Sequence, residues 1–137
     1  MSVAKRGAGP VKTGLLVIGH GSRAIEAVKV LSEAAVSVRR RFRRCIVEAC
    51  FLEINQPDVQ AGIDRLVAQG AGRILFVPFS LYVDGHVGRD LPEHITLARA
   101  RHPGIDIRIA PHLGPDHRLV AVCEDRIKQG LRAGRWT

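Results

Sequence analysis

Two histidines lie beside glycines at the ends of apolar segments, a pattern typical of a ligand site. His20 lies between Gly19 and Gly21, and His86 follows Gly85. Glycine lets a ligand approach the backbone closely because it carries no side chain. An imidazole, with its pKa of ~6.5, can hold a transition metal or accept a proton near pH 7. The pattern therefore indicates metal or proton chemistry; the structural alternative is two histidines that only hydrogen-bond to loop backbone.

Carboxylates accompany both histidines. Glu53 follows a third apolar segment, and Asp84 lies two residues before His86. Two imidazoles and a carboxylate suit iron, cobalt, nickel or zinc. Structural zinc normally has four protein ligands, so a set of two or three leaves positions at which an ion can be exchanged. Asp84 either adds a carboxylate near the metal or is a simple turn residue.

The segment after His20 offers an anion site. A helix that begins at Ser22 would present free N–H groups to a carboxylate or phosphate, with Gly21 and Arg23 beside them. The alternative is that Ser22 acts only as an N-cap. The chain has no G-x-G-x-x-G sequence and no P-loop lysine, and His20 and Ala24 replace the glycines that a nucleophile elbow requires around Ser22.

The elements that must position these residues form four strand–helix units. We expect strands at 11–19, 46–52, 73–81 and 105–110, and helices at 22–42, from 57, near 92–98 and from 116. Continuous apolar strands between amphipathic helices predict a three-layer α/β fold, with a four-stranded parallel sheet in the order 2-1-3-4. Ligands bind beyond the carboxyl ends of such strands, where the strand order reverses. His20 and His86 should therefore flank that point.

The rest of the chain is expected to form one domain over residues 11–133, with a flexible tail at 1–10 and another at 134–137. The last helix should face the core with Leu119, Val122, Cys123 and Ile127. The chain has three cysteines and no C-x-x-C pair, and Cys45 and Cys50 should point to opposite faces of one strand. Unpaired cysteines suit a reducing cytosol, so we expect a cytoplasmic protein.

The net charge of the chain excludes few classes of function by itself. The 137 residues carry 21 basic and 13 acidic side chains, a net charge of +8, and the excess lies in both tails and in the run 39–44. A nucleic-acid binder could use this surface, but few aromatic residues are present to stack on bases. A solvated helix end explains the run more simply. No apolar run approaches the ~20 residues needed to cross a membrane.

Five short motifs resemble those of one enzyme family. They are LVIGHGSR at 16–23, FLE at 51–53, VPF at 77–79, HV at 86–87 with DLPE at 90–93, and PHLG at 111–114. Together they resemble the short, single-domain class II sirohydrochlorin chelatases of the CbiX/SirB group, and they cover nearly the whole chain outside the tails. Asp84 and Ser80 depart from residues that are frequent in this family.

The resemblance implies insertion of a divalent metal into sirohydrochlorin, cobalt first and iron or nickel next, in cobalamin or sirohaem biosynthesis. It implies that His20 and His86 bind the metal and act in catalysis, with Glu53 as a further base or ligand. It implies no organic cofactor and suggests a homodimer. Arg23, Arg89 and the loop residues around them are expected to contact the carboxylates of the substrate; those loop residues are Gly21, Ser22, Asp84 and Gly85.

Two other functions remain open from the sequence. A metal or tetrapyrrole carrier would use the same histidines but would bind its ligand stoichiometrically, without turnover. A basic nucleic-acid-binding protein would use the arginine run and the tails instead, and would not depend on His20.

Overall fold

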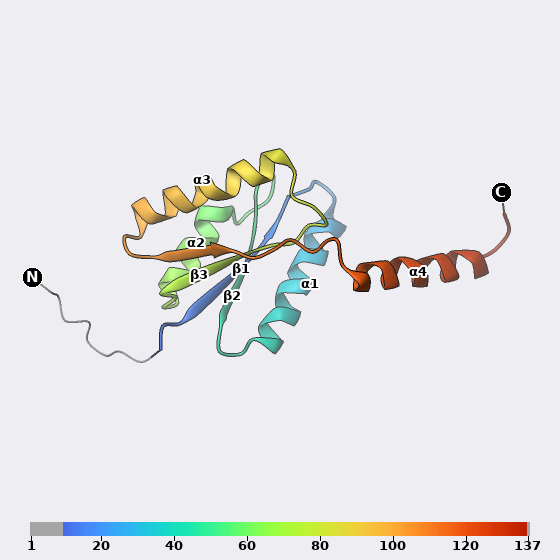
Figure 1. Cartoon of the computed structure of the whole chain (residues 1–137), viewed down its shortest axis with the longest axis horizontal. Helices are drawn as coiled ribbons and strands as arrows, with labels where there is room; N and C mark the ends of the chain where they lie inside the picture. The colour runs from blue at the N-terminus through green and yellow to red at the C-terminus, as the bar shows by residue number, and fades with distance from the viewer. Residues whose placement is uncertain (1–9, 137) are drawn as a thin grey trace, which may run out of the picture.

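The computed structural model describes residues 10–136, without the side chain of His86. Nearly all of the tail expected at 1–10, and Thr137, therefore lie outside the described residues. The elements alternate along the chain (Figure 1): β1 Thr13–Gly19, α1 Ile25–Arg41, β2 Ile46–Phe51, α2 Val59–Ala68, β3 Arg73–Pro78, α3 Gly85–Arg101, β4 Asp106–Ile109 and α4 His117–Arg132. In the described part of the chain, no helix is long and apolar enough to span a membrane.

The four strands form one parallel sheet in the order β2-β1-β3-β4, which confirms the predicted fold class. The register brings the carboxyl ends of β2, β1 and β3 together. Gly19 at the end of β1 pairs with Phe51 of β2, and Ile18 pairs with Pro78 of β3. The loops that follow these strands therefore leave the sheet from one edge.

Two apolar clusters fill the space on the two faces of the sheet. On one face, α2 and α3 cover buried side chains that include Leu16, Ile63 and Phe76. On the other face, α1 packs on β1 and β2 around Val17 and Leu31. The alternation of side chains along each strand separates the two clusters.

The cysteines follow the same alternation. Cys50 is buried in the cluster under α2 and α3, whereas Cys45 packs against the cluster under α1, as their odd spacing predicts. Burial raises the pKa of the Cys50 thiol, and the nearby Asp58 charge adds to this effect. Cys50 is therefore a core residue rather than a reactive thiol.

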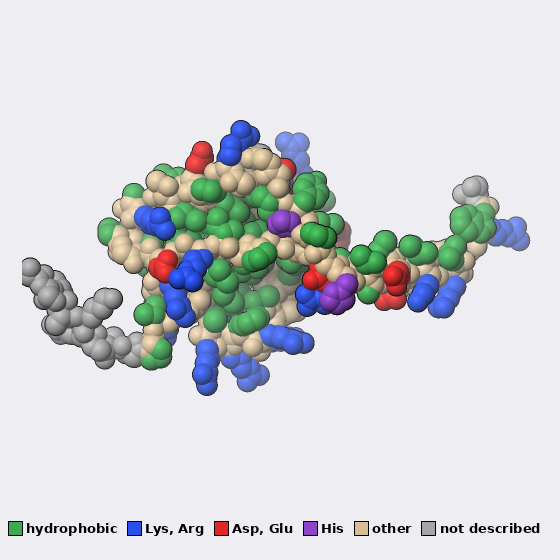
Figure 2. All heavy atoms as spheres, in the orientation of Figure 1, with side chains coloured by type: hydrophobic (Ala, Val, Ile, Leu, Met, Phe, Trp, Pro, Cys, Tyr) green, Lys and Arg blue, Asp and Glu red, His purple; other side chains and the backbone are tan. Residues whose placement is uncertain are grey.

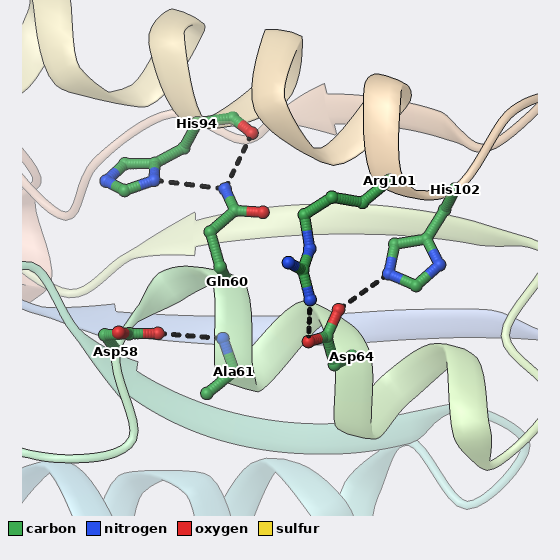
Figure 3. A network of polar contacts seen from close by, with 7 residues as sticks. All are labelled: Asp58, Gln60, Ala61, Asp64, His94, Arg101 and His102. Carbon is green, nitrogen blue, oxygen red and sulfur yellow. Dashed lines mark hydrogen bonds and ion pairs between the residues drawn. The ribbon is translucent and has the colours of Figure 1, made fainter.

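Polar contacts join α2 to α3 (Figure 3). The Gln60 amide donates to the carbonyl oxygen of His94 at 3.0 Å and lies 3.2 Å from its Nδ1. Asp64 pairs with Arg101, and its Oδ1 lies 2.7 Å from His102 Nε2. These contacts fix the lateral position of two helices whose apolar sides already rest on the sheet.

Several element ends differ from the predicted ones. Helix α1 begins at Ile25 rather than Ser22, because the Ser22 hydroxyl accepts the Ala24 amide in a local turn. Helix α3 begins already at Gly85, because Asp84 caps it, so Pro92 lies inside the helix. The strands are shorter by one to three residues than the apolar runs, since apolar residues continue into the loops.

Helix α4 does not pack on the sheet, so the prediction for its inward residues is wrong. No residue of α4, which lies wholly within the described part, is buried. Val122, Cys123 and Ile127 are exposed, and Leu119 is partly exposed. The helix runs away from the rest of the molecule (Figure 1). Helical periodicity shows that a helix has an apolar side, but it does not show what covers that side.

We expect Gly62→Ala to lower the free energy of unfolding by about 1–3 kcal/mol, because the added methyl overpacks the core. A Cβ at Gly62 would lie 2.7 Å from Leu16 Cδ1 and 3.0 Å from Cys50 Cβ. The matched control is Gly88→Ala in α3, where the nearest atom would lie 3.7 Å away. This change should be stabilising by up to about 1 kcal/mol. Urea unfolding measures both, and equal effects would contradict the expected crowding at α2.

Asp64 should make an acid-sensitive contribution to stability. Partial burial would raise the pKa of Asp64, but hydrogen bonds from His102 and Arg101 and their positive charges lower it overall. A lowered folded-state pKa stabilises the fold above the unfolded pKa, and this stabilisation is lost as the pH falls through the folded pKa. Because the carboxylate is partly exposed, we expect Asp64→Asn to cost about 0.5–1 kcal/mol at neutral pH.

The difference between Asp64→Asn and the wild type should shrink once the pH falls below about 3.9. Urea unfolding over a series of pH values measures it. Glu33→Gln on the exposed side of α1 is the control and should change stability little at any pH. A deficit in Asp64→Asn that stays constant into the acid range would show that the charge of Asp64 is not responsible.

Candidate functional site

The site is built where the chain leaves β1 and β2. The Leu52 amide donates to the Gly19 carbonyl oxygen at 2.9 Å, and the Glu53 amide donates to the His20 carbonyl oxygen at 3.1 Å. The two chains thus stay paired for two residues beyond the strands. His20 Nε2 lies 2.8 Å from Glu53 Oε1, and each side chain is about half exposed, at 51% and 49%. The structure therefore brings together two of the three residues predicted for catalysis.

Gly21 allows the two loops to approach this closely. Its φ is +107°, a backbone conformation that residues with a side chain rarely adopt. A Cβ at this position would lie 1.9 Å from the Glu53 carbonyl oxygen. The sequence predicts that Gly21 lets a ligand approach the backbone; in the structure it lets the backbone of the Glu53 loop approach.

Asn55 is a functional candidate that sequence reasoning missed. Its side-chain Oδ1 accepts the Ser22 amide at 2.7 Å. The amide that was expected to bind a substrate carboxylate is thus already hydrogen-bonded. The signal in the sequence was an amide side chain two residues after Glu53, in a loop whose ends are close: the Phe51 amide donates to the Pro57 carbonyl oxygen at 2.9 Å. Asn55 and Gly21 together hold the His20 and Glu53 loops in one arrangement.

Ile54 has an unusual backbone conformation between Glu53 and Asn55. Its φ is +68°, which is rare for a β-branched residue, and its side chain is 61% exposed. Such strain persists only where surrounding contacts determine the conformation, and it is concentrated at functional sites. Here the contacts are those of its two neighbours, and the result is an apolar side chain presented to solvent beside Glu53.

The second side of the site comes from the start of α3. Asp84 Oδ1 accepts the Val87 amide at 2.8 Å, so Asp84 is the N-cap of the helix, in line with its interpretation as a turn residue. Gly85 is the first residue of α3, His86 follows in the first turn, and Arg89 is exposed one turn later. The His86 side chain is not described, so its convergence on His20 stays a prediction.

A cavity of about 400 Å³ lies between these two sides. Its lining includes His20 and Asp84, with Ile18 and Pro78 from the ends of β1 and β3. This is the point where the strand order reverses, as the fold predicts. Two further lining residues were not foreseen: Leu81 and Tyr82, which are 59% and 71% exposed. They give the mouth of the cavity an apolar rim suited to the flat face of a ring system.

The described side chains form an imidazole–carboxylate pair rather than a closed metal cage. No group of three or more metal-ligating side chains lies close enough to hold an ion, within the part of the structure that is described. A carboxylate that accepts a hydrogen bond from Nε2–H of a neutral imidazole fixes the ring and leaves Nδ1 with a free lone pair. His20 can therefore occupy one coordination position of a metal ion, or accept a proton, while Glu53 orients the imidazole ring.

The comparisons with known proteins agree with one another. The model of the CbiX family matches residues 14–130. A sirohydrochlorin ferrochelatase of Priestia megaterium is 33% identical over 119 residues, which cover 84% of this chain and 43% of the relative. A sirohydrochlorin cobaltochelatase of Sulfurisphaera tokodaii is 30% identical over 120 residues, which cover 88% of this chain and 95% of that protein.

The solved structures include a similar fold with a metal. The crystal structure of the sirohydrochlorin chelatase SirB from Bacillus subtilis subspecies spizizenii, in complex with cobalt, superposes with a TM-score of 0.81 at 31% identity. The match covers 87% of this chain and 51% of SirB. Against several of the relatives, the chain spans only about half of the longer protein.

We expect Ile54→Gly to raise the free energy of unfolding by about 1 kcal/mol, because glycine removes the strain of the left-handed conformation. Leu97→Gly in α3, where the side chain is 53% exposed in an ordinary helix, is the control and should be destabilising by about 1 kcal/mol. Urea unfolding distinguishes the two. Destabilisation of both variants would show that Ile54 is not strained.

Proposed function

Because the chain belongs to the CbiX family, we propose that it inserts a divalent metal ion into sirohydrochlorin, with cobalt as the first candidate and iron or nickel as alternatives. The family match over residues 14–130 supports this proposal, as do relatives named sirohydrochlorin ferrochelatase and sirohydrochlorin cobaltochelatase. The reaction would serve cobalamin or sirohaem biosynthesis. It would take place in the cytoplasm, where the unpaired cysteines stay reduced.

The observation that carries the proposal is the His20–Glu53 pair at the mouth of the cavity. Metal insertion breaks two pyrrole N–H bonds, releases two protons and forms bonds from the ring nitrogens to one divalent ion. The enzyme must hold the ion weakly enough to release it and must accept protons. A half-exposed imidazole oriented by a carboxylate serves both needs, whereas a four-ligand site would retain the metal.

The roles of the residues follow from their positions. His20 Nδ1 would face the ion or a pyrrole proton, and Glu53 would orient His20 and stabilise its protonated form. His86, in the first turn of α3, would act from the other side of the cavity as the second metal ligand. Asp84 would hold α3 in place, since its carboxylate caps the helix.

The substrate would be held by its faces and by its edge. Leu81 and Tyr82 offer apolar contact to one face of the macrocycle. Arg23 follows the His20 loop and Arg89 lies on α3, so the two guanidinium groups come from opposite sides of the site and could pair with carboxylates on the tetrapyrrole rim. In the loops between them, Gly21, Ser22 and Gly85 would shape the backbone around the substrate.

The most specific part of the proposal is the identity of the metal. Imidazole and carboxylate ligands accept iron, cobalt and nickel alike, and affinity alone would favour nickel over cobalt and cobalt over iron. We place cobalt first because a relative that this chain covers over 95% of its length is named a cobaltochelatase. An anaerobic assay with each ion in turn separates the candidates.

We expect His20→Ala and His86→Ala each to reduce the rate of metal insertion by about 100-fold or more, because each removes a ligand or proton acceptor. His117→Ala on exposed α4 is the control and should keep the wild-type rate. The measurement is the absorbance change of sirohydrochlorin with cobalt, iron or nickel, with and without protein. Circular dichroism shows whether each variant is folded.

Folded His20→Ala and His86→Ala variants with wild-type rates would refute the assigned roles. If the wild-type protein metallates no more substrate than its own molar amount, it is a carrier and not an enzyme.

A further inference from the structure

Basic side chains line a hollow at the amino ends of the strands, at the opposite edge of the sheet from His20. The hollow has a volume of about 870 Å³, and we call it the basic hollow; its charged lining consists of Lys12, Arg43, Arg44 and Arg73. The first precedes β1, the next two lie between α1 and β2, and the last is the first residue of β3. Three segments that are far apart in the sequence therefore bring positive charge to one place.

The positive charges of the basic hollow are not neutralised within residues 10–136. None of its four basic side chains forms an ion pair with a described carboxylate, and all four residues are exposed. Asp106, on the neighbouring β4, lies 4.0 Å from Arg108. Figure 2 shows Lys and Arg side chains beside the point where the described chain begins. Like charges repel one another, so the cluster is unfavourable unless an anion balances it.

The arginine run around the end of α1 consists of two groups. Residues 39–41 lie in the last turn of the helix, where positive charge offsets the negative end of the helix dipole. Arg43 and Arg44 lie beyond the C-cap, Phe42, and line the basic hollow. A solvated helix end accounts for the first group. It does not account for the second group, which meets cations from two other segments.

Backbone contacts hold the walls of the basic hollow in place. The Lys12 carbonyl oxygen accepts the Gly72 amide at 2.9 Å, so the chain before β1 is tied to the start of β3. The Cys45 amide donates to the Phe42 carbonyl oxygen at 2.9 Å, which closes the turn between α1 and β2. A ligand would therefore meet charges on a backbone that is already ordered, which lowers the entropic cost of binding.

Arg73 is fixed through its side chain as well. Thr13 and Arg73 are register partners on β1 and β3, and Arg73 Nε donates to Thr13 Oγ1 at 2.7 Å. This bond uses Nε only, so both terminal nitrogens of the guanidinium keep their hydrogen atoms for an anion. A guanidinium held in one orientation can bind two oxygens of one phosphoryl group.

The shape and the charge of the basic hollow indicate a small ligand with adjacent phosphoryl groups. Its volume lies within the range of small-molecule sites, ~300–1,000 Å³. Four cations in one hollow suit concentrated negative charge, as in a polyphosphate chain, whereas the carboxylates of a tetrapyrrole are spread around its rim. A single-stranded nucleic acid would need aromatic side chains to stack on its bases, and none of the described lining residues is aromatic.

Apolar residues form part of the same lining. They include Val11, which is 57% exposed, and Ile46, which is partly buried. A Cβ at Gly72 would lie 2.7 Å from Val11 Cγ1, so Val11 rests on the turn before β3. An apolar surface beside a cluster of cations suits a base next to its phosphates. A nucleoside triphosphate and inorganic triphosphate are therefore the two sources of the polyphosphate group.

We propose that the basic hollow binds the polyphosphate group of a small molecule. The fork of Arg73 would bind one phosphoryl group, and the other three cations would neutralise the rest. Strand β1 separates this site from His20, since its seven residues span about 20 Å. Polyphosphate binding is therefore independent of the proposed metal insertion and should not compete with sirohydrochlorin.

Calorimetric titration of the full chain with inorganic triphosphate tests the site. We expect one ion per chain, with a dissociation constant on the order of 10–100 µM, from four charge-assisted contacts. Arg73→Gln and Arg44→Gln should each weaken binding by about 10-fold, because each removes one of these contacts. No saturable binding, or several weakly bound ions per chain, would overturn the proposal.

Arg40→Gln is the matched control for Arg44→Gln. It removes the same charge from the same run, but Arg40 lies in the last turn of α1 and does not line the basic hollow. It should weaken triphosphate binding by about twofold at most, because salt screens a distant exposed charge. Equal losses in Arg40→Gln and Arg44→Gln would show that triphosphate follows the net charge alone, and the site would be wrong. Circular dichroism shows that each variant is folded.

Two further titrations distinguish the ligands. If the apolar wall contacts a base, ATP should bind more tightly than inorganic triphosphate, and Val11→Ser should remove that difference without changing triphosphate binding. Equal affinities would assign the site to inorganic polyphosphate. A single-stranded oligonucleotide that binds more tightly than either would overturn the small-ligand site in favour of a nucleic acid. None of these measurements uses the chelatase reaction, so they stand or fall apart from the proposed function.

Discussion

The contact between Gly21 and the Glu53 carbonyl oxygen is the constraint on which the site depends. Any side chain at Gly21 would separate the two loops, since its Cβ would lie 1.9 Å from that oxygen. The same approach permits the hydrogen bond between His20 and Glu53 and the one between the Ser22 amide and Asn55. The imidazole is thus oriented before any ligand arrives, which is the condition for a metal or proton acceptor that acts in one fixed geometry.

The stability of the sheet allows the loops at its edge to keep this constrained arrangement. Central β1 pairs with both β2 and β3, and apolar clusters on the two faces hold its register. The loops can then carry features that stability alone would not favour: the left-handed Ile54 beside Glu53, and the exposed Leu81 and Tyr82. Strain and exposed apolar surface at one edge of a well-packed sheet are expected of a binding site.

Much of this arrangement could be predicted from the sequence. Uninterrupted apolar runs between amphipathic segments identify buried parallel strands, and the placement of His20 and Glu53 directly after two such runs predicts that they meet. The amide of Asn55, two residues after Glu53, could mark it as a candidate, but its bond to the Ser22 amide could not be predicted, because a side-chain hydrogen bond across two loops depends on the exact path of each loop. The predicted start of α1 is wrong for a related reason: the Ser22 hydroxyl accepts a hydrogen bond within a local turn and does not cap the helix.

Helix α4 shows a different limit of sequence reasoning. Its periodicity correctly indicates an apolar side, but the same pattern fits a helix on its own sheet and a helix on a second copy. The surface that covers this apolar side depends on the path of the chain between β4 and α4, and the spacing of side chains along a helix does not encode that path.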